Sequence, residues 1–259
     1  MVLIYNLRIY NNLEKNITKL HFNYNFNEKI RISNNITDII FGDDFNKKIK
    51  ISQNIIYLKF GNSFNNKIII PQNITYLYFE KRFNKKIKLS NNITNLTLRE
   101  NFNQKIKIPQ NITKLDIESN KKIKIPQNIK HLTLYCSIYQ KITIKIPQNI
   151  TRLSLNVNCK IKISQNIIDL SLNFKFDKKI KIPHNIKYLF LGYKYNKKIW
   201  IPINVRYLTY GYNFSQKIKL PHNIIYGPHK SCYGNSNDKY KPIIKCKTPQ
   251  NTINIICLR

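Results

Sequence analysis

Acidic residues, glycine and methionine are scarce in this chain. Among its 259 residues there are 12 Asp and Glu, 6 Gly and 1 Met. The few carboxylates are scattered, so no pair recurs at a spacing suited to general acid–base catalysis. There is no glycine-rich phosphate loop, and no Ser or Cys stands in a recognisable nucleophile setting. We therefore expect a non-enzymatic protein that uses no cofactor.

Long apolar runs are also missing. None approaches the roughly 20 residues that a membrane-spanning helix requires, and the start, Met1 to Arg8, is too short and too polar for a signal peptide. We therefore expect no membrane association and an intracellular, cytoplasmic location, in the host cytoplasm if the protein is viral.

The cysteines do not form a disulfide framework. There are five of them, an odd number without regular spacing, which indicates free thiols in a reducing compartment. The group of His229, Cys232, Cys246 and Cys257 near the C-terminus has two interpretations, a zinc site or free thiols in a capping segment. Its spacing matches no strong zinc pattern, so we predict no metal.

The charge is strongly one-sided. With 45 Lys and Arg against 12 acidic residues, the formal net charge is +33. Such an excess is typical of proteins that bind nucleic acid or another polyanion. A second explanation is genomic, because Lys, Asn, Ile, Tyr and Phe all have AT-rich codons and rise together in an AT-biased genome. Composition leaves both explanations open.

A repeat organises nearly the whole sequence. An Asn that precedes Ile or Val and then an apolar pair recurs mostly every 19 residues, with two intervals of 17 and one of 21. These odd intervals differ from 19 by two residues, which keeps the inward and outward alternation of a strand in phase. The repeats start at Asn16, Asn35, Asn54, Asn73, Asn92, Asn111, Asn128, Asn149, Asn166, Asn185, Asn204 and Asn223.

Each repeat contains two short alternating segments. In one of them Leu77 and Phe79 lie two residues apart and share one face of a strand. In the other, Ile87 and Leu89 do the same, and a Pro or Ser ends the segment. Nineteen residues leave no room for a long helix, so the pattern predicts a mainly β solenoid of about 12 coils with two short parallel strands per coil. The repeated Asn is predicted to bond the backbone of the adjacent coil at a corner.

Three segments follow from the extent of the repeat. Residues 1–15 are predicted to form an N-terminal capping segment, and residues 16–226 the solenoid. Residues 227–259 are predicted to hold an insertion loop and a degenerate capping repeat, because terminal repeats are atypical.

The repeats resemble the FNIP repeat, a relative of the leucine-rich repeat that is known from social amoebae and giant viruses of amoebae. The resemblance implies a leucine-rich-repeat-like solenoid whose first strand lines the binding face. Many FNIP proteins carry an N-terminal F-box, which implies substrate recognition for a ubiquitin ligase; only fifteen residues precede the first repeat here, so we expect no F-box. The residues that carry the resemblance are Phe45-Asn46 with Ile49 and Ile51, Phe83-Asn84 with Ile87, and Phe102-Asn103 with Ile106, Ile108 and Pro109.

The outward positions of the first strand vary from coil to coil. Stacking neighbouring coils is predicted to gather two aromatic clusters, of Tyr57, Tyr76 and Tyr78 and of Tyr188, Phe190 and Tyr207. Exposed tyrosine clusters are common at protein interfaces, although cross-strand packing that protects the sheet would also place them there. By the same pattern, Tyr226 is predicted to follow Tyr207.

The outward positions of the second segment are instead monotonous. They form a Lys column, which is either a solvated face that blocks aggregation or a track for a polyanion. Aromatic residues that could stack bases are nearly absent from it, with Trp200 the exception. The column contains Lys29, Lys48, Lys67, Lys86, Lys105, Lys122, Lys141, Lys160, Lys179, Lys198 and Lys217.

We predict a monomeric repeat scaffold that binds a protein partner, not identifiable from the sequence, through the variable face of the first strand. The alternative is binding of nucleic acid or another polyanion through the Lys column, with Lys48, Lys86, Lys105, Lys122, Lys179 and Lys198 as its candidate contacts.

Overall fold

The computed structural model describes the chain in two compact units, Met1–Ile129 and Lys130–Arg259. The described residues are 2–4, 16–118, 125–135, 146–158, 161–174, 176–211, 213–222, 224–228, 244–245 and 252–254.

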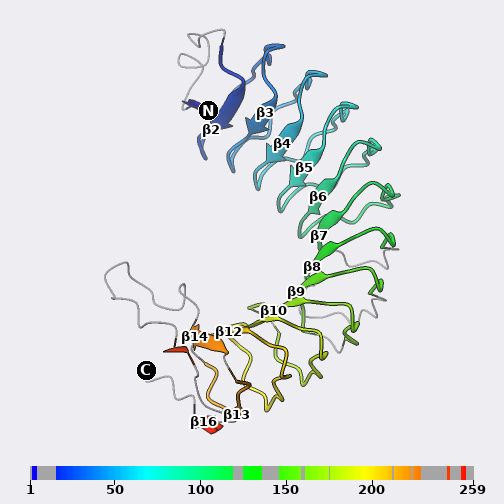
Figure 1. Cartoon of the computed structure of the whole chain (residues 1–259). Coiled ribbons are helices and arrows are strands. Elements are labelled where there is room, and N and C mark those ends of the chain that lie inside the picture. Colours follow the sequence, from blue (N-terminus) through cyan, green and yellow to red (C-terminus); the bar gives the residue numbers. More distant parts are fainter. Residues whose placement is uncertain are drawn as a thin grey trace. The chain divides into compact units, whose positions relative to one another are not determined.

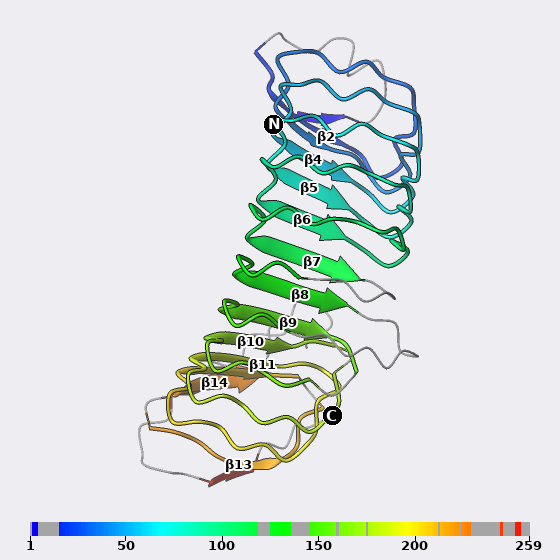
Figure 2. The same ribbon diagram turned by 90° about the vertical axis from the view of Figure 1, so that its right-hand side faces the viewer.

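The first unit is a stack of coils with one parallel strand per coil (Figure 1). The register aligns equivalent positions of successive coils, as in Leu58 opposite Leu77 and Phe60 opposite Phe79. Figure 2 shows β4, β5 and β6 side by side in this arrangement. The strands are β1 (Val2–Ile4), β2 (Lys19–Phe22), β3 (Asp38–Ile40), β4 (Tyr57–Phe60), β5 (Tyr76–Phe79), β6 (Asn95–Leu98) and β7 (Lys114–Glu118).

The second unit repeats this plan. Leu153 pairs with both Leu132 and Leu170, although the repeat intervals on its two sides are 21 and 17 residues, so the predicted preservation of phase is confirmed. Its parallel strands are β8 (His131–Tyr135), β9 (Arg152–Asn156), β10 (Asp169–Leu172), β11 (Tyr188–Leu191), β12 (Tyr207–Tyr210) and β14 (Ile225–Pro228).

The remaining strands of the second unit are β13 (Lys217–Lys219), β15 (Ile244–Lys245) and β16 (Thr252–Asn254). β15 pairs antiparallel with β14, and β16 pairs antiparallel with β13. A further coil would have added parallel strands instead. Most of residues 1–15 and 227–259 lie outside the described residues, so the predicted segment boundaries stay predictions.

The predicted fold class is confirmed in its main features. The described residues contain strands and turns but no helix, and the parallel strands recur with the 19-residue period of the sequence. One register prediction is wrong. Tyr207 pairs with Ile225, and Leu208 with Tyr226. The last parallel strand is therefore shifted by one residue, and Tyr226 does not follow Tyr207 in the outward column.

The core of each coil follows from the alternation in the first strand. In β4, Leu58 and Phe60 are fully buried whereas Tyr57 and Lys59 between them are half-buried. Burying a Leu or Phe side chain stabilises a fold by roughly 1.5–3 kcal/mol. No coil can bury these residues alone, so the stabilisation comes from the neighbouring coils.

Two stacks of Phe rings run through the first unit. In the stack on the first strands, formed by Phe22, Phe41, Phe60 and Phe79, successive ring centroids lie 5.0–5.5 Å apart. The second stack is formed by the Phe of each Phe-Asn pair, and its successive ring centroids lie 6.0–6.3 Å apart. Its members are Phe26, Phe45, Phe64, Phe83 and Phe102. The coils therefore diverge from the first strand toward the second segment.

This divergence explains a wrong prediction. Among the described residues, the second segment forms a strand only at β13 and is elsewhere an extended stretch outside any ladder. A ladder requires neighbouring strands about 4.7–4.9 Å apart. In the first unit the coils are already more widely spaced at the second Phe stack, before the chain reaches the second segment.

Two Asn ladders hold successive coils together at the corners. The Nδ2 of Asn73 donates to the carbonyl of Gln53, and that of Asn92 to the carbonyl of Gln72, both at 2.9 Å. This confirms the predicted role of the Asn that starts each repeat. In the other ladder, Oδ1 of Asn46 accepts a hydrogen bond from the backbone N–H of Asn65 at 2.9 Å. The Asn of the Phe-Asn pair is thus also a structural residue.

Candidate interaction surfaces

The first predicted aromatic cluster lies on β4 and β5 of the first unit. The Tyr57 ring lies 5.8 Å from that of Tyr76 and 5.5 Å from that of Tyr78. Tyr76 is 38% exposed, whereas Tyr57 and Tyr78 are half-buried. Burial raises the pKa of Tyr57, and the negative potential of Tyr78, Asp38 and Glu80 raises it further. The raised pKa keeps the Tyr57 hydroxyl neutral.

Charged side chains border this first cluster. Glu80 lies 3.1 Å from the Nζ of Lys59 and 3.8 Å from the Nε of Arg99. Lys19 and Asp38 are 3.4 Å apart on β2 and β3. These partly exposed pairs satisfy one another's charge, so the first cluster presents tyrosines within an internally paired polar rim.

The second predicted cluster lies on β11 and β12 of the second unit. The rings of Tyr188 and Tyr207 are stacked at 5.0 Å with an interplanar angle of 5°. They are 48% and 43% exposed, and Phe190 beside them is half-buried. The structure therefore brings these predicted residues together on one face, with Tyr188 and Tyr207 as its exposed pair.

Residues that the sequence analysis did not single out extend the second cluster. Ile168 is 38% exposed and precedes β10, while Lys187 and Arg206 immediately precede Tyr188 and Tyr207. Together with Asn166, Asn185 and Asn204 they line a hollow of about 570 Å³. In several other coils this position holds a Thr, as in Thr75 and Thr94, whose hydroxyl donates to a backbone carbonyl of the preceding coil. In the sequence, the replacement of this Thr by Ile168, Lys187 and Arg206 in three successive coils is the signal that could have identified these residues.

A half-buried carboxylate lies at the edge of the second cluster. Asp169 on β10 is the cross-strand neighbour of Tyr188 and lies 3.8 Å from the Nε of Arg152. Burial raises the pKa of Asp169, and the positive charges of Arg152 and His131 act in the opposite direction. The pairing keeps charge at the border while the tyrosines form the apolar centre.

The described members of the Lys column are all exposed. This holds for Lys48, Lys86 and Lys105 in the first unit and for Lys179 and Lys198 in the second. Lys122 lies outside the described residues. The predicted outward orientation of the described lysines is thus confirmed, and their role in binding stays a prediction.

The remaining candidates concern metals and membranes. Within the described ranges, no group of three or more His, Cys, Asp and Glu residues could hold a metal ion. His229, Cys232, Cys246 and Cys257 lie outside those ranges. No helix in the described part of the chain is long and apolar enough to cross a membrane.

Comparison with known proteins places the repeat in a family. The FNIP repeat model matches residues 45–82 and 83–119, which begin at Phe45-Asn46 and Phe83-Asn84 and hold two coils each. The crystal structure of CroV588, described as a novel circular LRR protein, is similar with a TM-score of 0.54 and 24% sequence identity.

The extent of that structural similarity is unequal. It covers 82% of this chain but only 41% of the CroV588 chain, and at this identity it concerns the fold alone. No functionally curated protein matches the chain. The Phe-Asn ladder, the parallel-strand coils and the matched residues agree: residues 45–119 match the FNIP repeat, and the fold is a leucine-rich-repeat-like solenoid.

Proposed function

We propose that this protein is a non-enzymatic scaffold that binds a protein partner through the outward face of β10, β11 and β12. The observation that carries the proposal is the exposed stack of Tyr188 and Tyr207. Repeat family and fold support it at the coarser level, because leucine-rich-repeat-like solenoids are typically interaction scaffolds.

The composition of this face fits a protein interface. Tyr and Arg are enriched at interface centres, where a few residues carry most of the binding energy. Here two stacked tyrosines lie beside Arg206, Lys187 and an exposed Ile168. Because the rings are already stacked in the free chain, binding loses little side-chain entropy. The first cluster, Tyr57, Tyr76 and Tyr78, offers a less exposed surface and is proposed as a secondary contact.

The test is capture of partners from an amoebal lysate with the full chain and with a variant carrying Tyr188→Ser, Phe190→Ser and Tyr207→Ser. Truncating an interface hot spot costs about 2 kcal/mol or more, so recovery of the partner should fall by about 30-fold. The matched control is Tyr24→Ser, which alters a tyrosine that is 67% exposed in a turn of the first unit.

Three results decide the test. Loss of a partner by the triple variant but not by Tyr24→Ser supports the proposal, provided that circular dichroism shows an intact sheet. Equal recovery by both variants would reject this face. Equal loss by both would show non-specific binding to tyrosine and would also reject it.

A polyanion-binding function is the second candidate, and the exposure of the Lys column favours it. If the lysines bind nucleic acid, affinity for a random oligonucleotide should fall steeply between low and physiological salt. Replacing Lys48, Lys86 and Lys105 by Gln should reduce the slope of log K against log salt concentration by about 2 to 3. Absence of binding at low salt would reject this candidate.

A further inference from the structure

An apolar residue interrupts the basic surface of the first unit. The position two residues after each member of the Lys column holds Lys50, Lys88 and Lys107 in three coils, but Ile69 in the coil between the first two. Ile69 is 88% exposed, the highest value among the exposed large apolar residues of the described chain. An aliphatic side chain left in water among lysines is unfavourable for solubility.

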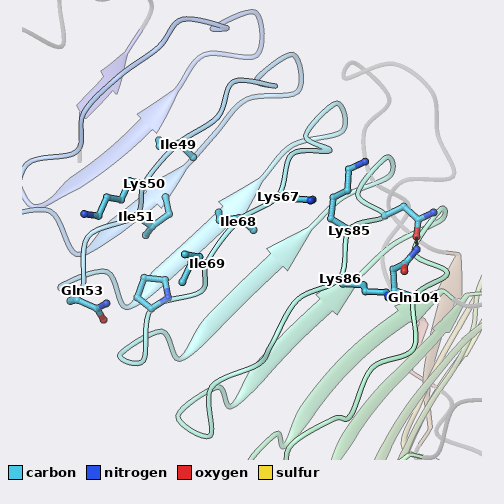
Figure 3. A pocket seen from close by; sticks show the side chains of 12 residues that line it. Ile49, Lys50, Ile51, Gln53, Lys67, Ile68, Ile69, Lys85, Lys86 and Gln104 are labelled. Atoms are coloured by element: carbon cyan, nitrogen blue, oxygen red, sulfur yellow. Dashed lines mark hydrogen bonds between the residues drawn. The ribbon is translucent and has the colours of Figure 1, made fainter.

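Ile69 lies in a groove rather than on a flat surface. Ile49, Ile51, Ile68, Ile69 and Pro71 form the apolar part of its lining (Figure 3), and its volume is about 930 Å³. The groove exists because the coils diverge at the second segment. A ladder there would have closed the gap between coils, whereas the divergence leaves Ile49 and Ile68 only half-buried.

The polar part of the groove lining is basic. Lys50, Lys67, Lys85 and Lys86 contribute to it (Figure 3). Lys48 lies with Lys50, Lys67 and Lys85 around an adjacent hollow. No Asp or Glu is among the described residues that line the groove. Gln53, Asn84 and Gln104 complete the lining, and the Nε2 of Gln104 donates a hydrogen bond to the Oδ1 of Asn84 at 2.9 Å. An occupant must therefore combine apolar groups with negative charge.

We propose that this groove binds an extended acidic peptide segment of a protein partner, in which apolar residues alternate with Glu or Asp. The apolar side chains contact Ile69, Ile68 and Ile49, and the carboxylates pair with the surrounding lysines. Charge complementarity argues for this occupant. A nucleic acid fits less well, because the described lining residues include no aromatic ring for base stacking.

This groove is separate from the tyrosine face of the proposed function. It is formed by second segments of the first unit, whereas Tyr188 and Tyr207 lie on first strands of the second unit. Failure of either proposal therefore leaves the other standing.

The probes are two fluorescent peptides of equal length and charge, one alternating Glu with Leu and one alternating Glu with Ser. Fluorescence anisotropy with the full chain at physiological salt should give about tenfold tighter binding of the Glu-Leu peptide. Ile69→Lys places in this coil the residue that most coils hold at this position, so the fold should be unchanged. The variant should bind both peptides about equally.

The control is Ile203→Lys, which changes an apolar residue that is 61% exposed in the second unit. It should leave the preference for the Glu-Leu peptide intact. The proposal is overturned if Ile69→Lys retains the preference, or if the wild-type chain shows none. A competition experiment uses an oligothymidylate with the same charge as the Glu-Leu peptide. If the oligonucleotide displaces the peptide, and Ile69→Lys increases that displacement, the groove binds nucleic acid and the proposal is overturned.

Discussion

Tyr195 provides a sharp test of how the rings hold the second unit together. It continues the ring stack between Phe176 and Phe214, at 6.2 and 6.3 Å, and is fully buried. Unlike Phe, it carries a hydroxyl, and this hydroxyl has no hydrogen-bond partner in the described part of the chain. Leaving a buried polar group unpaired costs about 1–3 kcal/mol. Tyr195→Phe should therefore stabilise the unit by about 1–2 kcal/mol near neutral pH.

The same substitution has a predicted pH dependence. Burial raises the pKa of Tyr195 to about 12, and the nearby Asp177 carboxylate adds to the effect. The folded chain then holds this proton more tightly than the unfolded chain, whose tyrosine pKa is about 10. The stability that depends on protonated Tyr195 is therefore fully present below pH 10, and it is lost as the pH rises toward 12. At about pH 11 the wild type should have lost a further 1.4 kcal/mol or so relative to Tyr195→Phe.

Urea denaturation followed by Trp200 fluorescence measures this difference, since Trp200 is the sole Trp and lies in the second unit. Tyr24→Phe is the control, because its ring is 67% exposed and should change stability little at any pH. A variant no more stable than the wild type at pH 8, or a difference that does not grow with pH, would refute the reasoning. Either result would indicate that the Tyr195 hydroxyl has a hydrogen-bond partner in the folded chain.

Three further predictions concern the ladder, the close approach of coils and the second unit's hydrophobic stack. Asn92→Ala should lower stability by about 1 kcal/mol in thermal unfolding, because it removes the bond to Gln72, whereas Asn91→Ala should have little effect. Gly61→Ala should lower the free energy of unfolding by about 1–3 kcal/mol, because an added Cβ would lie 2.3 Å from the Gly42 backbone oxygen. An unchanged thermal-unfolding midpoint would contradict the close approach of Gly61 and Gly42. Leu189→Ala should lower stability by about 2–5 kcal/mol in urea denaturation, since this side chain is 2% exposed.

The inward ladders could be predicted from the sequence because the period fixes which residues face the core. Leu58, Phe60 and Ile74 are all buried where the pattern placed them, and Asn73 bonds the adjacent coil as expected. These features depend only on repetition and on the alternation of a strand. Equivalent residues of neighbouring first strands pair because the repeat keeps them in the same register.

The second strand could not be predicted correctly for the opposite reason. Alternation of Lys and Ile shows which side faces outward, but it does not give the distance between coils. That distance is set by ring packing, which is wider around Phe45 than around Phe41. The groove around Ile69 follows from the same divergence and was missed with it.

The tyrosine face was predicted in part. Tyr188 and Tyr207 meet because equivalent positions of neighbouring coils are paired. Ile168, Lys187 and Arg206 were missed because they precede the strands, where alternation does not assign a face. Their replacement of Thr was the only sequence signal.

The most direct test of the proposed interface is hydroxyl-radical footprinting of the chain alone and with its captured partner. We predict strong protection of Tyr188 and Tyr207, and unchanged oxidation of Tyr24 in the first unit. Protection confined to residues outside β10, β11 and β12, with Tyr188 and Tyr207 oxidised as fast as in the free chain, would contradict the account.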